Sequence, residues 1–292
     1  MQLEEFQAAA KPVTSADKSL FEKYMRDYPS DICVYTFPFM LLWSVTRHHS
    51  YGEIDGHLVI SYRSANGEEC FYAPIGPNPA KIIREILPPS QGYSWKYINE
   101  ALAKDLETSF TLAWERDFFD YVYRVEDIAT LKGKAYAEKR TFINRCRALR
   151  PNILKLSSAM KDECMALHQR WVETQPDPNT PSIIEERRTL LSTMEQFEEL
   201  GFGGIGIQIQ GRLEALATWY PIHSKMVVED FEKASANIPG LYQLLLHELA
   251  KAVPRQYEFL NREADLGIPG LRTAKQRWNP VYLVKRFFIV KA

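Results

Sequence analysis

The chain has 292 residues, of which 46% are hydrophobic and 25% are charged. This composition is typical of a globular protein long enough for two domains, and it excludes extensive disorder. The formal net charge is −1, so a polyanion must bind to a local patch rather than to an overall basic field. Residues 1–10 lack the apolar core of a signal peptide, and the apolar stretch 32–45 is too short for a membrane span. We therefore expect a cytoplasmic protein with no integral membrane segment.

The cysteines and histidines do not indicate a metal centre. The four cysteines (Cys33, Cys70, Cys146 and Cys164) lie far apart, and the six histidines form no metal-binding signature. We expect buried thiols in a reducing compartment, no metal and no required cofactor.

The first half alternates helical and extended patterns. A hairpin is indicated where Asp55 and Gly56 form a two-residue turn between apolar segments. The expected elements are a helix around residues 20–24, a buried helix or loop and helix at 32–43, the hairpin at 51–63, a strand at 69–74 and a helix at 81–87.

The second half repeats this order. Its hairpin turns at Gln210 and Gly211, and its helix at 241–253 is strongly amphipathic. The expected elements are a strand at 152–156, a helix at 162–173, the hairpin at 204–219, strands at 225–228 and 257–261, a helix at 271–278 and a strand at 282–290. The repeated order predicts a tandem α+β or α/β fold with domains at 1–150 and 151–292, separated where Pro151 interrupts a basic helix.

The first candidate functional segment is the basic stretch 123–150. Arg140, Asn144 and Arg147 recur at the spacing of one helical face, which suits phosphate groups. Arg124 and Lys139 are further candidates for phosphate binding in the same stretch. The alternative is a solvated helix face with no ligand.

Two helices are expected to open with the same tetrapeptide, Ile-Pro-Gly-Leu, at residues 238–241 and 268–271. Proline suits a first helical turn, and the free N–H groups of a helix start bind anions. Gly240 and Gly270 would allow a ligand to approach the backbone closely. Asn237 and Tyr242 flank the first tetrapeptide and complete this set of substrate-binding candidates. The alternative is that Pro-Gly only ends a loop.

The third segment, 261–275, places polar residues directly after an apolar strand, where active-site loops commonly lie. Glu263 and Asp265 are the candidate catalytic residues, as a general base or a ligand for an ammonium group. Asn261, Arg262, Arg272 and Lys275 are candidates for binding substrate, phosphate or an oxyanion. The alternative is a network of salt bridges that only joins loop to helix.

These segments together resemble a known bacterial family. The matching residues are Arg124-x-Glu126-Asp127 with Lys139-Arg140 and Asn144, Glu232-Lys233-Ala234 with Gly240-x-Tyr242, and the long motif from Asn261-Arg262-Glu263 through Ile268-Pro269-Gly270-Leu271-Arg272 to Lys275. The family is of unknown function and is grouped with the C-terminal domain of phosphatidylglycerol lysyltransferases. The resemblance implies two GNAT-like (GCN5-related N-acetyltransferase-like) domains, as in Fem-type aminoacyltransferases, each a mixed and mostly antiparallel sheet flanked by helices.

Three functions follow from the residues and this resemblance. The first is transfer of an aminoacyl group from charged tRNA to an amine or hydroxyl on a small molecule, peptide or lipid headgroup. The second is a coenzyme A-dependent N-acyltransferase, although neither half contains the usual Arg/Gln-x-x-Gly-x-Gly/Ala loop. The third is a non-catalytic module that recognises a nucleotide or peptide on the same fold.

Overall fold

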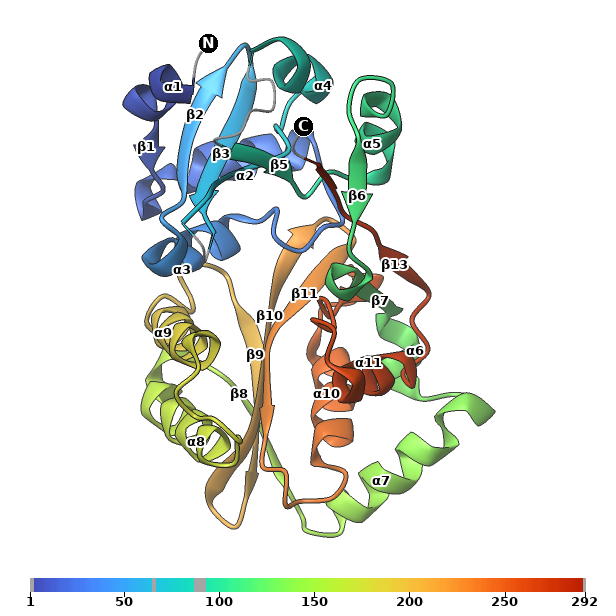
Figure 1. The fold of residues 1–292 in the computed structure, drawn as a ribbon. Helices are drawn as coiled ribbons and strands as arrows, with labels where there is room; N and C mark the ends of the chain where they lie inside the picture. The colour runs from blue at the N-terminus through green and yellow to red at the C-terminus, as the bar shows by residue number, and fades with distance from the viewer. Residues whose placement is uncertain (1–2, 65–66, 87–92, 291–292) are drawn as a thin grey trace. The chain divides into compact units, whose positions relative to one another are not determined.

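Figure 1 shows the computed structural model, which describes residues 3–64, 67–86 and 93–290. The chain divides into two units that each contain segments distant in sequence. Unit 1 comprises Met1–Asp120, Ala264–Ile268 and Leu283–Ala292, and unit 2 comprises Tyr121–Glu263 and Pro269–Tyr282.

Unit 1 contains a five-stranded sheet in the order β1-β2-β3-β4-β5 and a separate pair of strands, β14 and β6. Its elements are α1 (Leu3–Ala9), β1 (Lys11–Pro12), η1 (Ser15–Asp17), α2 (Lys18–Asp27), α3 (Phe37–Arg47), β2 (Ser50–Ile54), β3 (His57–Arg63), β4 (Glu69–Tyr72), α4 (Pro79–Lys81), η2 (Ile82–Ile86), β5 (Tyr93–Lys96), α5 (Glu100–Leu106), β6 (Leu112–Trp114), η3 (Arg116–Phe118) and β14 (Phe287–Ile289).

The local sequence explains several of these boundaries. The β2–β3 hairpin closes through Asp55 and Gly56, both with positive φ, as expected for this two-residue turn. Helix α3 begins only at Phe37, because the Thr36 side chain accepts a hydrogen bond from the Phe39 N–H and caps the helix. The expected helix at 81–87 is replaced by α4 and the π-helical turn η2, and Leu87 lies outside the described residues.

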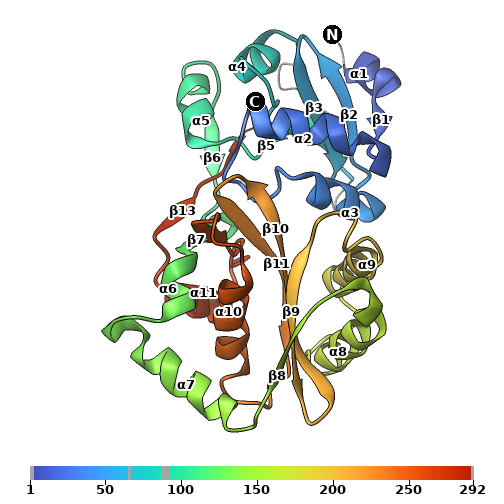
Figure 2. The same cartoon turned by 180° about the vertical axis from the view of Figure 1, so that it is seen from behind.

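Unit 2 contains a seven-stranded sheet in the order β13-β7-β12-β11-β10-β9-β8. In Figures 1 and 2, helices α8 and α9 lie on one face of this sheet and α10 lies on the other. Its elements are β7 (Asp120–Arg124), α6 (Val125–Thr130), η4 (Lys134–Tyr136), α7 (Ala137–Arg147), β8 (Asn152–Lys155), η5 (Ser158–Met160), α8 (Lys161–Glu173), α9 (Pro181–Glu195), β9 (Gly203–Ile209), β10 (Arg212–His223), β11 (Met226–Ala234), α10 (Leu241–Ala252), β12 (Phe259–Asn261), α11 (Pro269–Gln276) and β13 (Tyr282–Val284).

The same order of elements occurs in both units. Three antiparallel strands (β2–β3–β4 and β9–β10–β11) are followed by a helical segment, then by a strand parallel to the third one. The parallel pairs are β4–β5 in unit 1 and β11–β12 in unit 2. The predicted fold class, with mixed and mostly antiparallel sheets flanked by helices, is confirmed.

The boundaries of the units differ from the predicted domains. Helix α7 ends at Arg147, before Pro151, but residues 150 and 151 lie inside unit 2, and the first division falls after Asp120. The reason is the pairing of β7 with β12, which joins residues 122–124 to the sheet of unit 2. The division into GNAT-like domains at 150/151 remains a prediction.

The two Ile-Pro-Gly-Leu segments have different environments. Gly240 has a φ of 86°, and a Cβ built there would lie 2.2 Å from the main-chain oxygen of Phe142 in α7. A Cβ at Gly270 would meet no atom within 4 Å. The close approach predicted for Gly240 is therefore made by the backbone of α7.

This difference predicts opposite outcomes for the same substitution. Gly240→Ala is expected to lower the free energy of unfolding by about 1–3 kcal/mol, because alanine is strained at this φ and clashes with Phe142. Gly270→Ala, the matched control, is expected to change it by less than about 1 kcal/mol. Urea unfolding of both variants measures this, and equal effects would contradict the structure.

Candidate functional site

The parallel strands β11 and β12 diverge after three paired positions, the last of which joins Val228 to Asn261. Strand β11 continues to Ala234, whereas β12 ends at Asn261. Glu229 and Arg262 are the first residues beyond the paired region. Polar side chains from both strands meet at this point, where the pairing of β11 with β12 ends.

A β-bulge determines which side chains of β11 share a face. Trp219 of β10 pairs with Glu229 and Ala217 pairs with Glu232, so Thr218 alone faces both Asp230 and Phe231. The Phe231 N–H donates to Thr218 Oγ1 at 3.1 Å. The extra residue places Glu229 and Glu232, three positions apart, on the same side of the strand.

Arg262 joins these two carboxylates. Its Nε donates to Glu229, and its Nη2 donates to Glu232 at 2.6 Å. The Arg262 side chain is buried and lies over the ring of Tyr123, 5.7 Å from its centroid. Burial opposes a charge here, but Glu229 and Glu232 hold the pKa of Arg262 above its usual value, so the guanidinium remains positive.

Lys275 fixes helix α11 against this cluster. Its Nζ donates to the main-chain oxygens of Arg262 and Glu263. The main-chain oxygen of Lys275 accepts a hydrogen bond of 2.7 Å from the Tyr123 hydroxyl. Burial and the neighbouring Arg262 lower the pKa of Lys275. The polar cluster formed by Glu229, Asp230, Glu232, Arg262 and Lys275 is therefore built from β11, the end of β12 and α11.

Two buried carboxylate oxygens of the polar cluster have no hydrogen-bond partner within the described residues: Glu229 Oε1 and Asp230 Oδ2. Burial raises the pKa of Glu229 to about 7, although Arg262 opposes the shift. Burial also raises the pKa of Asp230, and Glu263 and Glu186 add to this effect. Unpaired buried carboxylates are costly, and groups with pKa values near neutrality can exchange protons at physiological pH.

A second set of ion pairs flanks Asp230. Glu186 of α9 accepts from Lys233 Nζ at 3.0 Å and lies 2.9 Å from His168 Nε2. Lys233 Nζ also lies 3.9 Å from the ring centroid of Trp171. Burial alone would raise the pKa of Glu186, but His168 and Lys233 lower it, so Glu186 is ionised beside Asp230.

Only some of the predicted site residues in segment 261–275 belong to the same unit. Asn261, Arg262, Glu263 and Lys275 all belong to unit 2, where the Asn261 side chain accepts from the Glu263 N–H at 2.8 Å. Asp265 belongs to unit 1, is fully buried, and pairs with Arg116 at 3.4 Å. Its other oxygen accepts from the Gly267 N–H, so the contacts of Asp265 are those of a structural residue.

The remaining predicted residues around the two Pro-Gly segments are mostly accessible. Asn237 and Gly270 are exposed, and Arg272 is half-buried. Tyr242 is half-buried, and its pKa is raised by burial and by Glu232, which places it beside the polar cluster. The role of these residues in substrate binding remains a prediction.

The basic stretch is less uniform than its sequence indicates. Arg124, Arg140, Asn144 and Arg147 are exposed, but Lys139 is buried, and burial lowers its pKa. Arg140 donates to the main-chain oxygens of Leu131 and Gly133, and Arg147 donates to Glu248 at 2.8 Å. Lys139 is therefore not part of an exposed phosphate-binding face.

Sequence reasoning did not identify Glu229, Asp230 and Glu186 as site residues. The predicted strand ended at Val228, whereas β11 continues to Ala234 and carries both acids. The available signal was the acidic run Glu229-Asp230 inside an apolar strand pattern, which is unfavourable unless the acids are paired or functional.

Comparison with known structures identifies the fold. FemX superposes with a TM-score of 0.62 and 9% identity, over 96% of this chain and 97% of that one. L-PGS from Bacillus licheniformis has a TM-score of 0.66 and 13% identity over 97% and 93%. A conserved protein of unknown function from Bacteroides thetaiotaomicron has a TM-score of 0.90 and 26% identity over 97% and 99%. The chain thus shares its fold with these three proteins.

The sequence comparison is more specific. Residues 25–290 match the family described as phosphatidylglycerol lysyltransferase, C-terminal. The chain belongs to this family. No protein of curated function matches the sequence. No helix within the described residues combines the length and apolar character needed to cross a bilayer, and no three metal-binding side chains meet there.

The double ion pair of Arg262 predicts a large effect on stability. Arg262→Met should lower the free energy of unfolding by about 3–5 kcal/mol, because it leaves two carboxylates near the core without a counter-charge. Adding Glu229→Gln and Glu232→Gln should recover part of that loss. Urea unfolding measures both effects, with Arg187→Met on the exposed surface of α9 as the control. A similar small loss in both single variants would contradict this role.

Proposed function

We propose that this protein transfers an aminoacyl group from a charged tRNA to an amine or hydroxyl acceptor. The observation that carries the proposal is the family match over residues 25–290, which includes the whole polar cluster. The structural similarity to FemX and L-PGS supports the same class of acyltransferase. We place the reaction in the cytoplasm, where charged tRNA is found.

The proposed reaction needs a proton acceptor and no covalent enzyme intermediate. The acceptor nitrogen or oxygen attacks the ester carbonyl, an amide or new ester bond forms, and the bond to the tRNA ribose oxygen breaks. Glu229 takes the proton from the attacking group, and the ribose oxygen leaves as a hydroxyl after receiving a proton. The unpartnered Oε1 and the pKa near 7 suit Glu229 to this role.

The neighbouring residues have separate roles in this proposal. Arg262 holds Glu229 in position through its Nε, and Glu232 occupies the other side of the same guanidinium. Glu263 is half-buried at the end of the motif and would bind the ammonium group of the aminoacyl donor. Burial, Glu263 and Glu186 raise the pKa of Asp230 and favour its protonated form, so Asp230 is not assigned the role of proton acceptor. No metal or bound cofactor is required, because the donor ester is already activated.

Exposed cations along η4 and α7 support binding of the tRNA phosphates. Lys134, Arg140, Arg145 and Arg147 are all exposed in this part of unit 2. Arg147 is half exposed in its ion pair with Glu248, and Glu248 keeps a second partner, Lys251, when Arg147 turns to a phosphate. Clustered cations bind a polyanion even when the net charge of the chain is near zero.

The choice between donors is tested directly. The protein is incubated with one of two labelled donors, which are bulk tRNA charged with individual radiolabelled amino acids and acetyl-coenzyme A. Three acceptors are offered to each donor: vesicles containing phosphatidylglycerol, a lysine-containing peptide and free amino acids. The proposal expects transfer from charged tRNA only. Transfer from acetyl-coenzyme A alone would establish the coenzyme A-dependent alternative, and no loss of either label would favour a binding module.

Glu229 gives the reaction a defined pH dependence. Only the ionised carboxylate accepts a proton, so the transfer rate should rise through pH 7 and level off above it. Glu229→Gln should lower the rate by about 100-fold or more and remove this rise. Glu173→Gln, an exposed residue of α8, is the matched control and should leave the profile unchanged.

The same pKa shift also affects stability, and this effect distinguishes a loss of catalysis from a loss of folding. Because the pKa of Glu229 is raised above its usual value of 4.5, its protonated form is favoured in the folded state, and its contribution to stability falls between about pH 4.5 and 7. Glu229→Gln should be at least as stable as the parent protein at pH 8. A rate loss that simply followed unfolding would contradict the catalytic role.

The salt dependence of tRNA binding tests the basic surface. The double variant Lys134→Ala/Arg147→Ala should reduce the slope of log affinity against log salt concentration by about 0.7–0.9 for each lost phosphate contact. Arg187→Ala/Arg188→Ala removes the same charge from the exposed side of α9 and should leave the slope unchanged. Filter binding of tRNA over a range of KCl concentrations measures both, and equal slopes in the two variants would refute specific contact with α7.

A further inference from the structure

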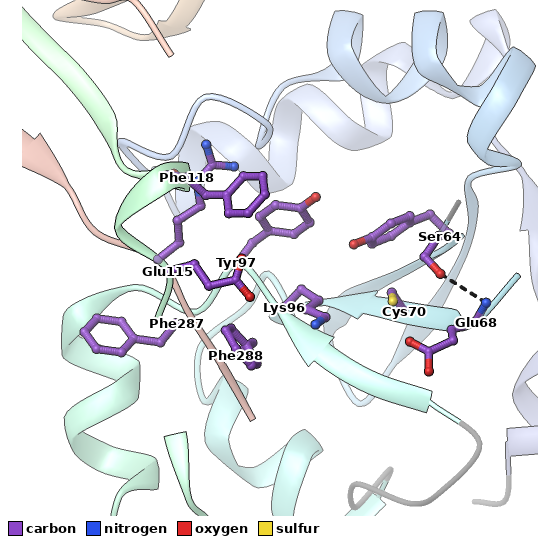
Figure 3. Close-up of a pocket in the computed structure, with 11 residues that line it drawn as sticks. Ser64, Glu68, Cys70, Lys96, Tyr97, Glu115, Phe118, Phe287 and Phe288 are labelled. Atoms are coloured by element: carbon purple, nitrogen blue, oxygen red, sulfur yellow. Dashed lines mark hydrogen bonds between the residues drawn. The ribbon is translucent and has the colours of Figure 1, made fainter. Parts of the chain in front are cut away.

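Unit 1 contains a pocket that the proposed transfer reaction does not use. Figure 3 shows it at the end of β5, between the sheet and the strand β14. Its volume is about 320 Å³, at the lower end of the range of about 300–1,000 Å³ for small-molecule sites. All of its lining residues belong to unit 1, including Tyr62, Lys96, Tyr97, Glu115 and Phe288.

The pocket carries one cation and one anion that no protein group neutralises. Lys96 and Glu115 form neither an ion pair nor a hydrogen bond within the described part of the chain. In Figure 3, the carboxylate of Glu115 extends toward the end of β5, where Lys96 lies. A second cation of the pocket, Arg286, is already paired with Asp120, so it is less available than Lys96 to bind a ligand anion.

Aromatic rings form the walls. Lys96 Nζ lies 4.4 Å from the ring centroid of Phe288, so its ammonium is held over an apolar surface. The ring of Tyr97 stacks on Tyr72, with centroids 4.7 Å apart and an angle of 24° between the rings. Phe118 and Phe287 also line the pocket, and Ser64, Glu68 and Cys70 form its more polar side. These walls favour a ligand with an apolar or aromatic body.

The backbone at the pocket is strained. Tyr97 has a φ of 57°, in the left-handed region that residues other than glycine rarely adopt. This conformation turns the chain directly after β5 and holds the Tyr97 ring against Tyr72, beside Lys96. Strain of this kind is concentrated at ligand sites, where the surrounding structure maintains it.

The charges limit the ligand class. A simple anion would be attracted by Lys96 but repelled by Glu115. A simple cation would be attracted by Glu115 but repelled by Lys96. A zwitterion satisfies both, with its carboxylate on Lys96 and its ammonium on Glu115. The size of the pocket and its aromatic walls further restrict the ligand to a small molecule with an apolar side chain.

We propose that this pocket of unit 1 binds a free α-amino acid with an apolar or aromatic side chain. Its carboxylate pairs with Lys96, its ammonium pairs with Glu115, and its side chain lies against Phe288 and Tyr97. This binding site is separate from the proposed transfer reaction, and it can be tested without tRNA.

The test is calorimetric titration of the whole protein with L-phenylalanine, L-leucine and L-lysine. L-Phenylalanine should bind saturably and more tightly than L-lysine, whose side chain brings a charge to apolar walls. N-acetyl-L-phenylalanine lacks the ammonium, and L-phenylalanine amide lacks the carboxylate. Each analogue should bind about tenfold or more weakly than L-phenylalanine, because each loses one charge-assisted contact.

Matched variants locate the binding. Lys96→Met and Glu115→Gln keep the approximate shape of the side chains and should each weaken L-phenylalanine about tenfold or more, with unchanged melting temperatures. Lys104→Met and Glu107→Gln make the same replacements on the exposed surface near α5 and should leave the affinity unchanged. Absence of saturable binding by the parent protein, or binding that survives both pocket variants, would overturn the proposal.

Discussion

The bulge of β11 opposite Thr218 is the constraint on which the polar cluster depends. In a regular strand, Glu229 and Glu232 would point to opposite faces of the sheet, and one guanidinium would not reach both. The single extra residue brings them to one side, where Arg262 at the end of β12 meets them. The bulge also places Asp230 near Glu186. Glu229 and Asp230, although adjacent in sequence, therefore have different surroundings.

The cluster balances its charges incompletely. Arg262 pairs with two carboxylates, and Lys275 donates its hydrogen bonds to main-chain oxygens. Within the described residues, one buried oxygen of Glu229 has no hydrogen-bond partner. A protein selected only for stability would replace such a group with an apolar residue or add a donor. Its position where the pairing of β11 with β12 ends is the physical basis for proposing chemistry at this site rather than in the loop that follows.

Sequence patterns predicted the elements with local causes. The Asp55-Gly56 and Gln210-Gly211 turns, the amphipathic α10 and the end of α7 all follow from neighbouring residues. The long motif after β12 contains Arg262 and Lys275, which lie in one polar cluster, and their role in binding substrate or phosphate stays a prediction. What it could not reveal depends on distant partners: Asp265 pairs with Arg116, Lys139 is buried near Trp278, and Glu229 and Asp230 share β11 with a bulge. These contacts cross more than 10 residues of sequence or require an irregular register.

The pairing of β14 with β6 has a consequence for synthesis of the chain. Phe287–Ile289 pair with Leu112–Trp114, so unit 1 includes a strand that the ribosome makes after all of unit 2. Domains usually fold in the order of translation. Here β6 must wait for the last strand before its pairing is complete, whereas the strands of the sheet β1–β5 are all made before it. The nascent chain therefore exposes the unpaired edge of β6 during elongation, and chaperone binding at that stage would favour correct folding.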